Sequence, residues 1–181
     1  MFEKHLEIER RWLLRGLPLS EILSRSMLST RTTIYVVRDP MLELRIRERT
    51  KSDREVDYGV VAKVGSGMTR NETPKIPCGG KLFRYYMVQR KPYLTKEHFE
   101  VVDMTTATNG LKWEISLFVE PPNIKGLVLA ELEFDDIGAA NAFSTDRDLP
   151  EWLRSLVIKE VTDDPRYNGK NLAVSGRPNP E

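Results

Sequence analysis

Apolar and polar residues alternate along much of the chain, and a period of two residues is typical of strands that bury one face. Together with enrichment in β-branched and aromatic residues, the alternation predicts strands at His5–Leu13, Thr32–Val37, Met41–Arg49, Asp57–Val64, Phe83–Gln89, Phe99–Asp103, Lys112–Phe118 and Val128–Phe134. Turn-forming stretches separate them at Thr50–Asp57, Thr73–Gly80, Met104–Gly110 and Glu120–Gly126. Many short strands separated by turns predict a mainly β (α+β) fold, a barrel or a sandwich with a few helices.

Helical patterns are fewer and shorter. They predict helices at Leu19–Leu28, at Asp136–Phe143 behind an aspartate cap, at Pro150–Val157 behind a proline, and at Pro165–Ala173. The chain shows no internal repeat and no interdomain linker. We therefore expect one domain over residues 1–181, with a loose tail at about 175–181.

Three of the predicted strands carry rows of charge on one face. The first row is Glu7, Glu9 and Arg11, the second is Arg45, Arg47 and Arg49, and the third is Glu131, Glu133 and Asp135. Contact with solvent is the simplest interpretation of any one such face. Like charges in a row repel one another, however, and a solvated surface normally mixes both signs. A ligand that resolves the repulsion is the alternative interpretation.

The two kinds of row suit two parts of one ligand. Arginine side chains donate paired hydrogen bonds to phosphate oxygens. Glutamate pairs suit hard divalent cations such as Mg²⁺ or Mn²⁺, which prefer oxygen ligands. Both rows, turned into a barrel, would form a site for a metal-chelated polyphosphate, whereas unpaired charges buried there would be costly.

The net charge of +1 hides an asymmetry along the chain. Residues 1–91 hold 19 Lys+Arg and 11 Asp+Glu, whereas residues 92–181 hold 9 and 16. One half supplies most of the cations and the other most of the carboxylates, although chance and surface solvation remain an alternative explanation. No apolar run approaches the ~18 residues of a membrane span, and the charged N-terminus lacks a signal-peptide core. With Cys78 as the only cysteine, we expect no disulfide and a cytoplasmic protein.

Ordered motifs add a family resemblance to this picture. Glu7-Ile8-Glu9-Arg10-Arg11-Trp12 resembles the ExExK signature that opens the CYTH domain, the superfamily of triphosphate tunnel metalloenzymes. Later segments resemble that domain in the same order: Leu44–Arg47, Lys63 with Gly65-Ser66-Gly67, Arg70-Asn71-Glu72, Trp113-Glu114-Ile115, Leu129–Phe134 and Lys159–Tyr167. The resemblance covers nearly the whole chain. It implies a closed eight-stranded antiparallel β-barrel and is closest to the small bacterial inorganic triphosphatases.

The resemblance also implies roles for individual residues. Metal ligands for Mg²⁺ or Mn²⁺ would be Glu7, Glu9, Glu114, Glu131 and Glu133, and phosphate-binding residues would be Arg11, Arg45, Arg47, Lys63, Arg70 and Arg90. Arg90 and Tyr35 would have catalytic roles. Arg90 lies in Gln89–Tyr93, where the family often has Lys-x-Arg-Tyr with a lysine linked to water activation, and a register shift would place Lys91 there instead.

Two further positions depart from the family pattern. Arg11 replaces a lysine of the opening signature, and Ser116 stands where an aspartate often follows Trp-Glu-x. An arginine at position 90 would be a poor proton acceptor, because guanidinium groups are effectively never neutral. Catalytic efficiency is therefore the property that these departures affect most.

The sequence leaves three functions open. The first is metal-dependent hydrolysis of a triphosphate, either inorganic or attached to an organic group, and the second is a class IV-type adenylate cyclase. The third is a binding module for nucleotides or polyphosphates. The expected partner is a triphosphate-containing small molecule, with nucleic acid only as a 5′-triphosphate end, no membrane, and an unassigned oligomeric state.

The remaining candidate residues have simpler interpretations. His5 and His98 are expected to be structural or exposed, because no nucleophile motif accompanies them. Cys78 is expected to be a loop thiol, since zinc sites need several Cys or His residues. Glu160 is open between a metal ligand and an anchor for the last helix through Arg166. The tryptophans, Trp12, Trp113 and Trp152, are expected to fill gaps between barrel and helices.

Overall fold

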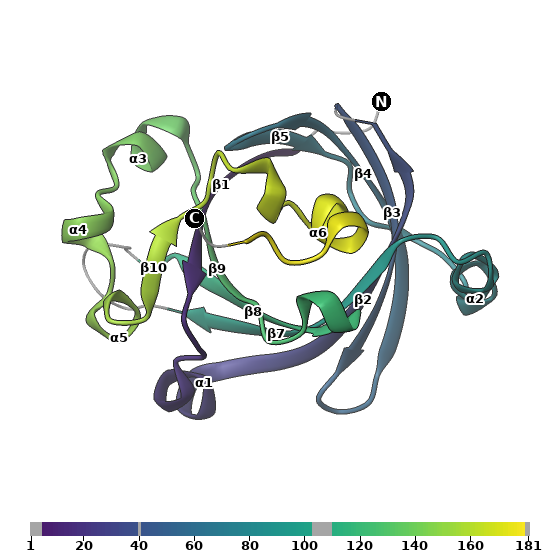
Figure 1. Cartoon of the computed structure of the whole chain (residues 1–181), viewed down its shortest axis with the longest axis horizontal. Coiled ribbons are helices and arrows are strands. Elements are labelled where there is room, and N and C mark those ends of the chain that lie inside the picture. The colour runs from purple at the N-terminus through teal and green to yellow at the C-terminus, as the bar shows by residue number, and fades with distance from the viewer. Residues whose placement is uncertain (1–4, 40, 103–109, 180–181) are drawn as a thin grey trace.

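The fold is a sheet of antiparallel strands that closes on itself, as a computed structural model shows for residues 5–39, 41–102 and 110–179 (Figure 1). The order around the ring is β1 (His5–Leu14), β5 (Thr69–Glu72), β4 (Val56–Ser66), β3 (Leu42–Lys51), β2 (Ser26–Arg38), β7 (Tyr93–Val102), β8 (Lys112–Glu120) and β9 (Val128–Glu133). β9 pairs with β1 and completes the ring. The predicted closed eight-stranded barrel is therefore confirmed.

Two short strands lie outside this ring. β10 (Val157–Glu160) pairs with β1, and β6 (Ile76–Pro77) pairs with β4. β5, which the alternation did not predict, supplies the eighth strand of the barrel in place of Phe83–Gln89. It pairs with both β1 and β4 and so links these two strands in the ring.

Most of the apolar core lies on the outer face of the barrel. Trp12 of β1 and Trp113 of β8 are fully buried there, with ring centroids 5.2 Å apart. Covering this face are α1 (Leu19–Arg25), α3 (Ile137–Ala142), α4 (Thr145–Asp148) and α5 (Glu151–Arg154). Trp152 of α5 packs edge-on against Trp113, so the gap-filling role expected for the tryptophans is confirmed. The apolar outer face leaves the opposite face of the same strands for polar residues.

A second covered patch on the outside corrects one of the expected elements. Residues Gly80–Val88 form the helix α2, not the predicted strand Phe83–Gln89. Phe83, Tyr86 and Met87 are spaced three and four residues apart, so they share one helical face, and they pack with Ile34 and Ile46 of β2 and β3. Their aromatic and apolar content is equally typical of a strand, which is why the pattern was misread.

The last helix lies across the ring of strands in Figure 1. After a 3₁₀ turn at Pro165–Tyr167, α6 (Gly169–Ser175) buries Leu172 in an apolar cluster with Leu94 and Leu129, from the inner face of the barrel. Gly169 approaches Tyr35 so closely that a Cβ at this position would lie 2.2 Å from the tyrosine hydroxyl oxygen. Glycine is therefore required where the helix begins.

Several boundaries differ from the expected ones. α1 ends at Arg25 and β2 begins at Ser26, so the predicted helix Leu19–Leu28 runs three residues too far. β7 begins at Tyr93 rather than Phe99. Within the tail expected to be loose, Arg177 N donates a hydrogen bond to Asn123 O. Asp103 and most of the expected loop Met104–Gly110 lie outside the described residues.

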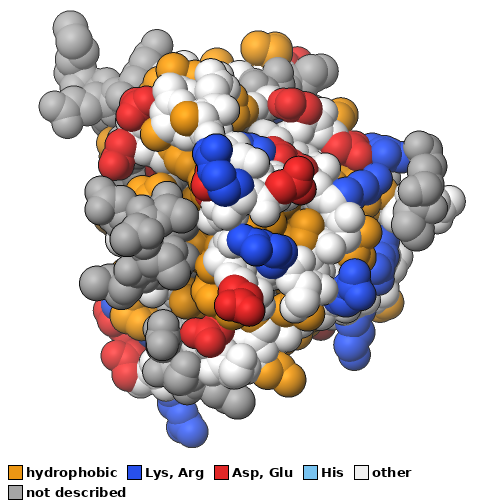
Figure 2. All heavy atoms as spheres, turned by 90° about the vertical axis from the view of Figure 1, so that its left-hand side faces the viewer, with side chains coloured by type: hydrophobic (Ala, Val, Ile, Leu, Met, Phe, Trp, Pro, Cys, Tyr) orange, Lys and Arg blue, Asp and Glu red, His pale blue; other side chains and the backbone are white. Residues whose placement is uncertain are grey.

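The outer surface over α3, α4 and α5 mixes its charges. Figure 2 shows Lys and Arg side chains interspersed with Asp and Glu on this face, between apolar and neutral atoms. This pattern is typical of a solvated surface. Across the described ranges, no helix is long and apolar enough to cross a membrane.

Candidate functional site

The inner face of the barrel encloses a charged cavity of about 350 Å³. Its lining includes the basic residues Arg11, Arg31, Arg45, Arg47, Lys63, Arg70 and Lys96 and the acidic residues Glu7, Glu9, Glu43, Glu72, Glu114, Glu131 and Glu133. All the metal and phosphate ligands expected from the sequence are among these residues, except Arg90, and Tyr35 also lines the cavity. Strand alternation brings them together, because each lies opposite the apolar outer face. Asp135 lies beyond the end of β9 and is exposed.

Arg11 joins the two acidic strands that close the barrel. In the register of β1 and β9, Glu9 lies opposite Glu133, and Arg11 lies opposite Glu131. The Arg11 guanidinium is 2.7 Å from Glu131 Oε1 and 2.5 Å from Glu9 Oε1, and it donates a further hydrogen bond to Asn168. Although burial opposes ionisation, Glu131 and Glu9 outweigh it and raise the pKa of Arg11. Burial likewise opposes ionisation of Glu131, but Arg11 and then Lys96 hold its pKa well below the usual range.

The hairpin of β4 and β5 contributes two further cations to the cavity, one from each strand. Lys63 Nζ lies 2.5 and 2.6 Å from the two carboxylate oxygens of Glu7 and 2.8 Å from Glu72. Arg70 contacts Glu9 and lies 3.3 Å from Glu7. Lys63 and Glu72 are register partners across this hairpin, which explains their contact. The predicted metal ligands Glu7 and Glu9 are thus already held by cations of the same cavity.

Arg47 differs from these paired cations. The described residues offer its guanidinium no ion pair, and its buried Nε has no hydrogen-bond partner among them. Burial first, and then the like charges of Arg45 and Arg31, lower the pKa of Arg47 to about 10. The side chain is still a cation at neutral pH. It therefore carries a half-buried positive charge that an anion in the cavity would stabilise.

β7 contributes a lysine that the sequence analysis missed. Burial, with only partial opposition from Glu131, lowers the pKa of Lys96 to about 8. Lys96 Nζ donates a 2.8 Å hydrogen bond to Ser116 Oγ and lies 3.9 Å from Glu131 Oε2. Because the nearest partner is a neutral hydroxyl, little holds the amine in its charged form. Ser116, where the family often has an aspartate, therefore helps to keep this lysine easy to deprotonate.

Arg90, which was expected to bind phosphate and act in catalysis, is not among the residues that line the cavity. It follows α2 on the outside of the barrel, where it is exposed and has a φ of 50°. Lys91, the alternative at this point, is exposed too. The chain turns here from α2 into β7, and the inward alternation starts only at Leu94 and Lys96. That alternation, which continues through His98 and Glu100, is the signal that would have identified Lys96.

Glu160 also lies outside the cavity. Its carboxylate accepts hydrogen bonds from Arg10, Thr145 and Thr162, which fasten β10 to β1 and to α4. Arg166 pairs with Asp164 instead. Neither of the two roles left open for Glu160, metal ligand or anchor through Arg166, agrees with these contacts.

Solved structures are the known proteins to which this chain is similar. No family model and no curated protein matches the sequence. Two solved structures of the protein NE1496 do match, each with 24% identity. One, described as a hypothetical protein, covers 94% of this chain and 99% of its own with a TM-score of 0.60. The other, described as an inorganic triphosphatase, covers 93% and 95% with a TM-score of 0.61.

A third structure is more distant. HpAC1 from Hippeastrum, described as an adenylyl cyclase with a dominant triphosphatase activity, has 10% identity over 75% of this chain and 82% of its own, with a TM-score of 0.47. The likeness to NE1496 spans almost the full length of both chains. The closed ring of eight antiparallel strands is thus shared from end to end. The overall fold of this chain is therefore that of the NE1496 structures.

Proposed function

We propose that this protein hydrolyses a triphosphate inside its barrel with the help of a divalent metal ion, Mg²⁺ or Mn²⁺. The observation that carries the proposal is the half-buried Arg47, whose guanidinium has a buried Nε and lies beside Arg45 and Arg31 without a carboxylate ion pair among the described residues. Three neighbouring guanidinium groups suit a phosphate chain, because each can donate two parallel hydrogen bonds to its oxygens.

The composition of the cavity favours an anion that arrives with its own cations. Seven basic and seven acidic side chains line the cavity and nearly cancel in charge. A bare triphosphate would add several negative charges to this balance. Glu7, Glu9, Glu131 and Glu133, with Glu114 close by, offer the all-oxygen donors that Mg²⁺ and Mn²⁺ prefer. When bound there, the ion would neutralise charge on the phosphate oxygens.

The chain's own residues account for the rest of the mechanism. Arg31, Arg45 and Arg47 hold and orient the phosphate chain, which positions its terminal phosphorus for in-line attack by water. The attacking water forms the new P–O bond and loses a proton to Lys96 Nζ, while the bond to the bridging oxygen breaks and the rest of the substrate leaves. A pKa of about 8 leaves part of Lys96 neutral near pH 7, as a proton acceptor must be. Ser116 fixes the position of the amine.

Tyr35 has a narrower role in this proposal. Burial raises the pKa of its hydroxyl, so the group stays protonated and can only donate or accept a hydrogen bond. Its contact with the start of α6 places it at the end of the cavity that this helix covers. We assign it to orienting the substrate.

The test is product analysis with inorganic triphosphate and with ATP, in Mg²⁺ or Mn²⁺ and after addition of a chelator. Metal-dependent release of phosphate, lost in Lys96→Met and in Glu133→Ala, is the expected result. A cyclic nucleotide as product would instead identify a cyclase. Triphosphate that raises the melting temperature but is never cleaved would identify a binding module and overturn the hydrolase proposal.

A further inference from the structure

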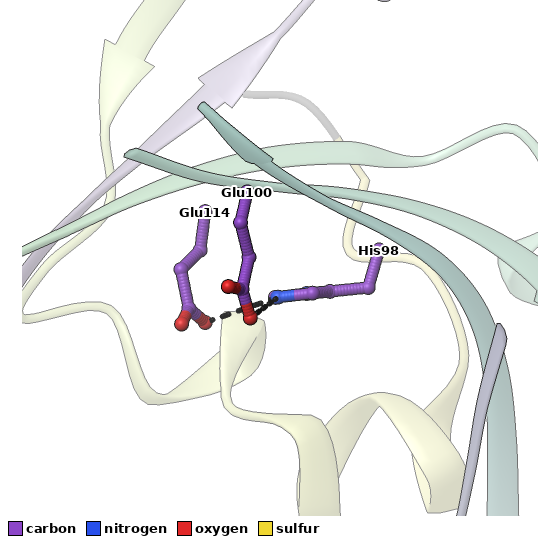
Figure 3. Close-up of side chains that lie close together, drawn as sticks. All are labelled: His98, Glu100 and Glu114. Atoms are coloured by element: carbon purple, nitrogen blue, oxygen red, sulfur yellow. Dashed lines mark ion pairs between the residues drawn. The ribbon is translucent and has the colours of Figure 1, made fainter. Parts of the chain in front are cut away.

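One wall of the barrel carries a histidine between two glutamates. His98 and Glu100 come from β7 and Glu114 comes from β8, and the three side chains converge in Figure 3. His98 Nε2 lies 3.5 Å from Glu114 Oε2 and 3.6 Å from Glu100 Oε1. The three candidate ligand atoms all lie within 4.8 Å of one another. In a tetrahedral zinc site, ligand atoms about 2.1 Å from the ion lie about 3.4 Å from one another. A small contraction would bring these three atoms to that spacing.

The ring nitrogen at the centre of this group has no hydrogen bond. The His98 side chain is 0% exposed, and among the described residues its Nε2 is one of the few buried side-chain nitrogens without a hydrogen-bond partner. Both carboxylate oxygens that face it lie beyond good hydrogen-bond distance. A fully buried polar atom without a partner is costly, and a cation between the imidazole and the two carboxylates would satisfy all three groups.

The surrounding contacts orient each of the three side chains. His98 Nδ1 lies 3.4 Å from Ser116 Oγ, which can accept a hydrogen bond from the Nδ1–H group of the tautomer whose lone pair is on Nε2. Lys112 Nζ approaches the far oxygens, Glu100 Oε2 at 3.5 Å and Glu114 Oε1 at 3.4 Å. Arg31 donates to Glu100 Oε1 at 2.8 Å, and Arg49 Nη2 lies 3.7 Å from the same oxygen, beyond hydrogen-bond distance, so that oxygen keeps a second lone pair. Such outer contacts commonly fix the ligands of a metal site.

We propose that His98, Glu100 and Glu114 form a separate site for a divalent transition-metal ion of the zinc class. One imidazole and two carboxylates are a mixed nitrogen and oxygen donor set, which suits Zn²⁺ or Co²⁺ better than Mg²⁺. The all-oxygen group of Glu7, Glu9, Glu131 and Glu133 would favour the opposite choice. This inference goes beyond the proposed hydrolysis, and of its three ligands only Glu114 also lies beside the proposed Mg²⁺ or Mn²⁺ site.

The test uses untagged full-length protein, stripped with chelator and titrated with Zn²⁺ in the absence of any triphosphate. Calorimetry gives the affinity and the stoichiometry, and X-ray absorption at the zinc edge detects imidazole among the ligands. Because the chain has only two histidines, His98→Asn and the control His5→Asn decide which ring binds. Glu9→Gln removes a carboxylate of the all-oxygen group and serves as a second control.

We expect one tightly bound Zn²⁺ per chain with an imidazole ligand. That imidazole signal should be lost in His98→Asn, with affinity reduced more than about tenfold, and should be unchanged in His5→Asn and Glu9→Gln. If His98→Asn fails to fold, Glu100→Gln should show the same loss of affinity. An imidazole signal that persists in His98→Asn, or zinc bound only through oxygen, overturns the proposal. Phosphate release with Mg²⁺ is measured separately, so a failure of hydrolysis and a failure of this site are distinguishable.

Discussion

Two groups of cations share the cavity and differ in how they are compensated. Arg11, Lys63 and Arg70 form a paired group, each in contact with a carboxylate of Glu7, Glu9 or Glu131. Arg47 and Lys96 form a sparsely paired group, since Arg47 has no carboxylate partner among the described residues and Lys96 has one only at 3.9 Å. The difference separates two uses of buried charge. Cations that are paired with carboxylates help to hold the barrel closed. Cations without such partners can bind an anionic ligand or, as in Lys96, exchange a proton.

The pKa values follow the same division. The paired carboxylates raise the pKa of Arg11, whereas burial without such partners lowers that of Arg47 to about 10 and that of Lys96 to about 8. Substitutions in the paired group should therefore affect stability first. Substitutions in the sparsely paired group should affect binding or turnover with little loss of stability.

The largest effect is expected from Lys96→Met, which removes the proposed proton acceptor but keeps the length and packing of the side chain. Proton transfer by a positioned group contributes about 10²–10⁴-fold, so kcat for phosphate release should fall by that range. In the unmodified protein, kcat/KM should rise as the pH increases through about 8, because only the neutral amine accepts a proton. A pH–rate profile that keeps this limb in Lys96→Met would contradict the role of the lysine.

A large loss of stability is expected from Arg11→Met. The change leaves Glu9 and Glu131 buried beside each other without the guanidinium that separates them. Removing one partner of a buried ion pair costs about 3–5 kcal/mol, and the free energy of unfolding in denaturant should fall by that amount. Double substitution with Glu131→Gln should recover part of the loss. If Arg11→Met unfolds no more easily than the unmodified protein, the paired group does not stabilise the barrel.

Arg47→Met should produce the reverse pattern of effects. Triphosphate affinity should fall about 10- to 100-fold, since hydrogen bonds to charged groups contribute about 1.5–3 kcal/mol. The free energy of unfolding should stay constant or rise, because a buried charge without a counter-ion has been removed. Arg90→Ala, at an exposed arginine outside the cavity, is the matched control and should change neither quantity. Equal loss of affinity in both variants would show that Arg47 has no special place in the site.

The smallest effect on the maximum of kcat/KM at high pH is expected from Ser116→Asp, which moves Lys96 from the sparsely paired toward the paired group and so shifts the pH profile. A carboxylate at hydrogen-bond distance from Nζ would favour the ammonium form and raise the pKa of Lys96 by about 1–3 units. The rising limb of kcat/KM should move to higher pH by that amount, and activity near pH 7 should fall accordingly. An unchanged profile would mean that the Ser116 contact does not set the basicity of this amine.

The alternation of residues predicted a barrel or a sandwich and the charged rows of three strands, and the family resemblance added the closed barrel. The rows in β1, β3 and β9 could be predicted because their charges are two residues apart within strands whose other face is plainly apolar, as for Arg45 and Arg47. The resemblance to a family then assigned these rows to one interior. The face on which a charged side chain lies can therefore be predicted from sequence where it follows from the spacing within one strand.

Other parts of the site depended on information that local spacing does not contain. Lys96 was missed because the start of β7 could not be located, and the match of Gln89–Tyr93 to a family motif drew attention to Arg90 instead. Glu72 belongs to the site through its cross-strand register with Lys63, which the β4–β5 turn fixes. Glu43 was overlooked, although its spacing from Arg45 in β3 places it on the same inner face. The metal group at His98 requires two strands to lie in one register, Glu100 opposite Glu114.

The pairing of β1 with β9 also affects how the molecule assembles. Arg11 and Glu131 are in contact although they are 120 positions apart in the sequence. The ring can therefore close only after nearly all of its strands have been synthesised. Pairings this distant in the chain are slow to form, because the entropy of loop closure is lost before any contact compensates for it. A ligand that bridges Glu9 and Glu131 would stabilise the pairing of β1 with β9 that closes the barrel. Its binding free energy would add to the cooperative stability of the whole barrel rather than to one local segment.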